Sequence, residues 1–118
     1  MQNLSDADKL ESIKSLQSTI MKLENALSQM TQKGTNTTLV HKRLKALSIG
    51  LAVLEQLWHQ KPHSYTLDDC AEARNVIIGL TPSVESSYAK SKEGSPQRTL
   101  LERRLRALDL AVQALTDS

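Results

Sequence analysis

Two histidines, two aspartates and one cysteine stand close together near the middle of the chain, and all are residue types that can bind a transition metal. The group is His59, His63, Asp68, Asp69 and Cys70. A spacing of four residues places two imidazoles on one helix face, but Pro62 stands between the histidines and interrupts any helix there. Cys70 falls on a predicted apolar helix stripe, where a thiol packs as a small hydrophobic group. We therefore predict neither a metal site nor a cofactor.

One further histidine, His41, could relay a phosphoryl group, with Lys42 and Lys45 stabilising the phosphate charge. The phosphotransfer pattern would need Lys-Gly at the third and fourth positions after the histidine, and Leu44 and Lys45 stand there instead. The sequence also lacks a Glu-x-x-Glu pair, a glycine-rich phosphate loop and a nucleophile-elbow motif. We predict that the protein is not an enzyme, with a phosphorelay through His41 as an alternative function.

The composition is typical of a small helical protein. The chain has 118 residues and is rich in leucine, with no phenylalanine, one tryptophan and one cysteine. This favours a single helical-bundle domain over residues 1–118 and excludes an internal disulfide framework. No apolar stretch approaches the roughly 18 residues that a membrane-spanning helix needs, and the polar N-terminus has no signal-peptide pattern. We therefore expect a cytoplasmic protein that does not associate with membranes.

One helical segment occurs twice in the chain. Residues 38–54 align without gaps with residues 99–115. The identical positions are Thr38/Thr99, Leu39/Leu100, Arg43/Arg104, Leu44/Leu105, Ala46/Ala107, Leu47/Leu108 and Leu54/Leu115. A supersecondary unit is used twice when one copy cannot bury its own apolar face. We predict a duplicated helical hairpin, with repeats at 5–59 and 66–117.

Apolar residues recur at steps of three and four over four segments, which predicts four amphipathic helices. The segments are 6–30, 38–58, the stretch that begins after Thr66 and ends before the 91–96 loop, and 98–116. Pro82 lies inside the third helix, so we expect a kink or a break near it. The 60–65 linker spans at most roughly 20 Å, whereas the preceding helix is about 30 Å long. The third helix must then begin where the second ends, which predicts an up-down-up-down four-helix bundle.

In that topology, charged residues separate toward two ends of the bundle. Most acidic residues gather where the first and third helices begin, and most basic residues gather at the opposite end. The basic pole comprises Lys42, Arg43, Lys45, Arg103, Arg104 and Arg106. These cations occupy early helix turns, where the helix dipole disfavours positive charge by a few tenths to about 1 kcal/mol. A binding site for an acidic partner would explain why basic residues occur in the early turns of both helices. The alternative is a solvated face that both helices inherited by duplication.

A second apolar strip runs along the second and fourth helices, away from their main stripes. Its larger members are Leu39, Ile49, Val53, Leu100 and Leu110. An exposed apolar strip would mark an interface with a partner or with a second copy of the chain. Alternatively, these two helices lie at the centre of the bundle and bury more of their circumference.

These observations favour a non-enzymatic interaction module, such as a regulator, an inhibitor, an immunity-type protein or a chaperone-like adaptor. We expect it to bind an acidic protein partner or an anion through the basic pole, and a homodimer is a second possibility. Nucleic acid is the weaker alternative, because the basic pole has no aromatic residue that could stack on bases and no known recognition motif. Binding through phosphate contacts alone would be sensitive to salt and without sequence specificity.

Overall fold

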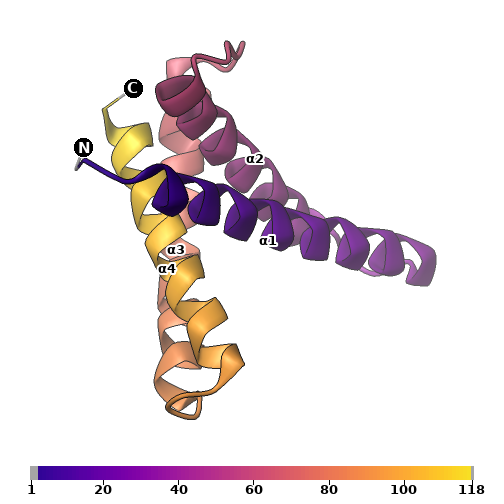
Figure 1. Ribbon diagram of the computed structural model, residues 1–118. Helices are drawn as coiled ribbons and strands as arrows, with labels where there is room; N and C mark the ends of the chain where they lie inside the picture. Colours follow the sequence, from indigo (N-terminus) through magenta and orange to yellow (C-terminus); the bar gives the residue numbers. More distant parts are fainter. Residues whose placement is uncertain (1–2, 118) are drawn as a thin grey trace.

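The computed structural model describes residues 3–117, which form four α-helices joined by short connections (Figure 1). The helices are α1 (Asp6–Lys33), α2 (Thr38–His59), α3 (Leu67–Lys90) and α4 (Pro96–Thr116). There is no β-strand within these residues. The prediction of an all-α protein with four helices is confirmed. No described helix is both long enough and apolar enough to cross a membrane.

The helix ends follow from capping residues that the sequence makes visible. Ser5 caps α1 and Thr66 caps α3, each side-chain oxygen accepting a hydrogen bond from the backbone N–H three residues further on. In α3 the Asp69 carboxylate also accepts from the Thr66 backbone N–H, at 3.0 Å, which completes a capping box. α1 extends to Lys33 because Gly34 adopts the left-handed conformation, with φ of 71°, that ends a helix. α4 begins two residues earlier than predicted, because Pro96 suits the first helical position.

α2 and α4 form the centre of the fold. Each of them contacts all three other helices, whereas α1 and α3 contact only α2 and α4 within the described residues. Gly50 allows α2 and α4 to approach closely, since a Cβ atom added there would lie 3.3 Å from the Ala111 Cβ and 3.3 Å from the Ile77 Cδ1. The largest fully buried side chains among the described residues are Leu16, Leu47, Ile49, Leu54, Ile77 and Leu108.

The central position of α2 and α4 decides the outcome for the second apolar strip. Ile49, Val53 and Leu110 are buried in the core, with exposed fractions of 1%, 6% and 3%. They therefore pack inside the protein and are not available as a docking face. Leu39 and Leu100, which the sequence alignment pairs, remain more than half exposed.

The two helix pairs diverge from the centre (Figure 1). The 34–37 connection between α1 and α2 and the 91–95 connection between α3 and α4 lie at separate ends of the molecule, and α1 crosses α4 close to the start of α1. The protein measures 42 × 39 × 20 Å, and its smallest dimension corresponds to two layers of helices, each about 10 Å thick.

α3 runs without interruption through Pro82. The predicted break is therefore absent, and a kink at this point stays a prediction. A proline inside a helix removes one backbone hydrogen bond. In the preceding residue, the Thr81 hydroxyl donates to the Ile77 carbonyl at 2.8 Å, which adds a side-chain hydrogen bond to the same turn.

Several residues that are 61 positions apart lie in similar environments in the two helix pairs. The caps Ser5 and Thr66 have this spacing. So do core residues whose exposed fractions are all 5% or less, namely the pairs Leu16/Ile77, Ala46/Ala107, Leu47/Leu108, Ile49/Leu110 and Leu54/Leu115. α1 therefore corresponds in position to α3, and α2 corresponds to α4.

Candidate anion-binding site

Two of the six basic-pole residues form ion pairs with the first turns of α1. The Arg103 Nε lies 3.0 Å from the Glu11 Oε1, and the Arg106 Nη1 lies 3.2 Å from the Asp8 Oδ1. These contacts contradict the predicted separation of acidic and basic ends. The separation fails because α1 crosses α4 near the start of α1, which brings the acidic turns of one helix beside the basic turns of the other. Both ion pairs are open to solvent, and such pairs contribute about 0–1 kcal/mol.

Lys42 and Lys45 of α2 lie beside acidic residues of α3, just as Arg103 and Arg106 of α4 lie beside acidic residues of α1. Together with Asp69 and Glu72 they line a small surface depression between the two helices. The pKa of Asp69 is below its usual value, chiefly because its carboxylate accepts the backbone hydrogen bond of Thr66, with a further contribution from the positive charge of Lys45. Lys42 and Lys45 therefore face carboxylates, as Arg103 and Arg106 do.

The remaining basic-pole residues, Arg43 and Arg104, lie together. Both are partly buried and both line one pocket of about 140 Å³, here called the four-helix pocket. α2 and α4 contribute Arg43, Leu47, Arg104 and Leu108 to its lining. α1 and α3 contribute Thr19, Leu23, Leu80, Ser83 and Val84. No carboxylate is among these lining residues, so two arginines line the pocket and no negatively charged residue does.

Neither Arg43 nor Arg104 has a hydrogen-bond or ion-pair partner among residues 3–117. The Arg104 Nε is buried and its hydrogen has no acceptor in the described part of the protein. A buried polar group without a partner destabilises a protein by about 1–3 kcal/mol, and arginine does not lose its charge at any ordinary pH. Arg104 therefore has one unsatisfied donor inside the protein, next to a pocket that the same residue helps to line.

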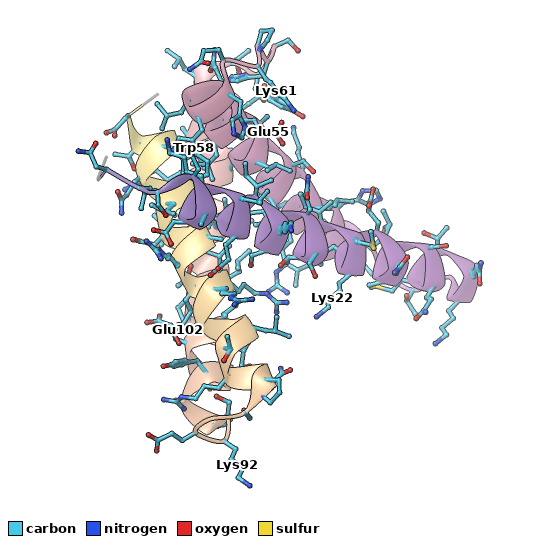
Figure 2. All side chains as sticks on the ribbon, in the orientation of Figure 1. Lys22, Glu55, Trp58, Lys61, Lys92 and Glu102 are labelled. Atoms are coloured by element: carbon cyan, nitrogen blue, oxygen red, sulfur yellow. The ribbon has the colours of Figure 1, made fainter. Side chains whose placement is uncertain are left out.

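The four-helix pocket adjoins a larger groove through their shared residue Arg104. This α1–α4 groove has a volume of about 250 Å³ and is lined by Glu11, Lys14, Ser15, Ser18, Lys22, Leu100, Arg103 and Arg104. Its single carboxylate, Glu11, is bound by Arg103. Figure 2 shows Lys22 leaving α1 on the side that faces the N-terminal half of α4. The groove consequently has more positive than negative charge along its walls.

Lys14 and Lys22 are functional candidates that the sequence pattern alone did not single out. Their signal in the sequence is the spacing of Lys14, Ser18 and Lys22 at successive steps of four, which places all three on one side of α1. That side becomes part of a groove only because α4 lies across it. Leu100, predicted as an interface residue, also lines this groove, whereas its counterpart Leu39 lies exposed on the surface of α2.

The residues that resemble metal ligands are separated by the fold or used in local structure. Cys70 is buried in the core, and Asp69 caps α3. The His63 Nδ1 accepts a hydrogen bond from the Tyr65 backbone N–H at 3.1 Å. Within residues 3–117, no group of three or more His, Cys, Asp or Glu side chains is arranged to hold a metal ion. His41 is exposed on the first turn of α2.

The candidate site thus consists of two arginines from matching positions of α2 and α4 in a carboxylate-free pocket, and a groove with excess basic residues that shares Arg104 with it. No protein-family model, no curated protein and no solved structure matches the chain.

Proposed function

We propose that this protein is a non-enzymatic helical interaction module that binds an acidic protein partner. The α1–α4 groove, together with the adjoining four-helix pocket, forms the binding surface. The observation that carries the proposal is the pairing of Arg43 and Arg104 in a pocket that has no carboxylate in its wall. The other basic-pole residues have acidic neighbours, so they need no partner to compensate their charge.

The charge of the groove favours an acidic partner over a neutral one. Lys14, Lys22 and Arg104 line it without an ion pair to any described carboxylate, and its only carboxylate already binds Arg103. An acidic partner would be attracted at long range and would satisfy these donors on contact. Leu100, which is 53% exposed in the groove wall, offers apolar area that such a partner would cover.

We also infer that the chain is a duplicated hairpin, with repeats at 5–59 and 66–117, in an up-down-up-down order. The equal spacing of the caps, of the core residues and of the two guanidinium groups supports this inference. The contacts of Arg103 with Glu11 and of Arg106 with Asp8 have counterparts in Lys42 near Glu72 and Lys45 near Asp69. Duplication would place the two arginines at equivalent positions on either side of one pocket.

The proposal is tested with a fluorescent poly-glutamate chain as a probe of acidic polypeptides. The variant Lys14→Glu/Lys22→Glu reverses two charges of the groove, and we expect its dissociation constant to rise at least tenfold. The matched control is Lys90→Glu/Lys92→Glu, which makes the same change in net charge at the far end of the α3–α4 pair, where Figure 2 labels Lys92. We expect a much smaller rise for the control.

Equal weakening by both variants would show that poly-glutamate responds only to net charge and would overturn the proposal. A single-stranded oligonucleotide serves as the competing probe. If it binds more tightly than poly-glutamate, and its affinity falls steeply with salt, the partner is a nucleic acid and the proposal is likewise overturned.

A further inference from the structure

We propose that the four-helix pocket binds a phosphate dianion, either free or carried as a phosphomonoester on a larger molecule. This inference deepens the proposed function and rests on it, because it names the acidic group that the partner presents to Arg43 and Arg104. It follows from the charge, the size and the wall of this one pocket.

The charge of the pocket matches a dianion. Arg43 and Arg104 each contribute one permanent positive charge, and no carboxylate lines the pocket. A phosphomonoester carries about −1.5 to −2 charges near pH 7, so one phosphate group neutralises both guanidinium groups. A carboxylate neutralises only one of them. The pocket therefore favours phosphate or sulfate over acetate.

The size of the pocket suits one such group. Its volume is about 140 Å³, well above the roughly 10–15 Å³ that a single water molecule needs. That volume accommodates a tetrahedral oxyanion with a few waters. The α1–α4 groove shares Arg104 with the pocket, so the remaining part of a larger molecule would lie in that groove.

The donors in the wall also fit an oxyanion. The guanidinium groups come from matching positions of two helices that touch at Gly50 and Ala111. Arginine presents its donors in a planar fork that fits two phosphate oxygens at once, and neither Arg43 nor Arg104 is bound to another described residue. The aliphatic residues of the pocket keep the surroundings apolar, which strengthens charge-assisted hydrogen bonds.

The test is calorimetric titration of the full chain with inorganic phosphate, sulfate and acetate at pH 7.5 and constant ionic strength. We expect a dissociation constant on the order of 1 mM for phosphate, comparable binding of sulfate, and at least tenfold weaker binding of acetate. Arg43→Gln and Arg104→Gln should each weaken phosphate binding at least tenfold. Lys92→Gln, at the far end of the α3–α4 pair and outside both the groove and the pocket, should leave it within twofold of the parent protein.

A phosphoserine peptide distinguishes free phosphate from a carried phosphate, since additional contacts in the groove should make it bind more tightly than inorganic phosphate. Its affinity should fall about tenfold between pH 7.5 and pH 5, because the second pKa of the phosphate is near 6 and the arginines do not titrate. A peptide that binds no better than inorganic phosphate would assign the pocket to the free anion.

Failure of this inference is distinguishable from failure of the proposed function. The phosphate site is refuted if no binding is detected at phosphate concentrations up to 50-fold above the expected dissociation constant. It is also refuted if both arginine variants bind phosphate with the affinity of the parent protein. Poly-glutamate binding that still depends on Lys14 and Lys22 would leave the proposed function standing. Circular dichroism of each glutamine variant establishes that it is folded, and Arg104→Lys provides a second variant that keeps the charge while removing the fork.

Discussion

Replacing Arg104 with methionine should stabilise the protein when no anion is present. The Arg104 Nε is buried without an acceptor among the described residues, and such a donor costs about 1–3 kcal/mol. Methionine keeps a flexible aliphatic side chain against Leu47 and Leu108, which line the same pocket. Part of the gain is offset because the exposed part of the guanidinium loses its hydration. We therefore expect a net gain of about 1 kcal/mol, or about 4 °C in the melting temperature.

The assay is thermal unfolding followed by circular dichroism, first in a buffer that contains neither phosphate nor sulfate. Phosphate is then added at ten times its dissociation constant, which should stabilise the parent protein by about 1.4 kcal/mol. Arg104→Met should gain nothing from the addition. The variant is thus expected to melt above the parent protein without phosphate and at or below it with phosphate.

Arg103→Met is the matched control, because Arg103 is the neighbouring residue and its ion pair with Glu11 is open to solvent. Its stability should change by at most about 1 kcal/mol, and its response to phosphate should persist. An unsatisfied, anion-binding Arg104 is refuted if Arg104→Met melts below the parent protein in the absence of anions, or if phosphate raises the melting temperature of the variant as much as that of the parent.

Four further substitutions test the fold that builds the pocket, each by urea or acid unfolding. Gly50→Val should destabilise the protein by about 1–3 kcal/mol, because a Cβ there would already lie 3.3 Å from the Ala111 Cβ. Its control is Gly79→Ala, at an open position of α3, which should stabilise the protein by about 0.5–1 kcal/mol. Equal effects of the two substitutions on stability would refute the close contact of α2 with α4. Leu54→Ala should cost about 2–5 kcal/mol, since Leu54 is fully buried, and a loss below 1 kcal/mol would place it outside the core. The pKa of Asp69 is lowered in the folded protein by the backbone hydrogen bond at the N-cap, so its contribution to stability is present above its ordinary pKa of 3.8 and disappears as the pH falls through the folded value. Asp69→Asn should flatten the loss of stability below pH 4, and an unchanged acid transition would contradict that role.

Much of the fold was predictable because its signals are local. Ser5 and Thr66 are strong N-cap residues, and the apolar spacing that follows each of them is helical. The alignment of residues 38–54 with 99–115 also pairs Arg43 with Arg104, the two arginines that line one pocket.

The charge arrangement was not predictable, since it depends on how the helix pairs diverge. Two hairpins aligned side by side would have gathered the cations at one end, but α1 crosses α4 and carries Asp8 and Glu11 onto Arg106 and Arg103. The sequence contains no signal for that crossing angle, because it is set by side-chain packing between distant segments.

Burial of the second apolar strip could not be predicted from the sequence either, because it also depends on packing between distant segments. Ile49 and Leu110 have the pattern of either an interface or a crowded helix. Only the number of neighbours around α2 and α4 decides between the two, and each of these helices has three. Likewise, Pro82 predicts a kink or a break from local geometry alone, whereas α3 is continuous across it.

An NMR titration of the arginine side-chain Nε–H resonances with inorganic phosphate would show directly whether the four-helix pocket is an anion site. If Arg43 and Arg104 share one anion, their Nε–H signals shift together with a single dissociation constant, while those of Arg103 and Arg106 stay nearly unchanged. Equal shifts of all four arginines, or no shift at Arg104, would contradict a shared site.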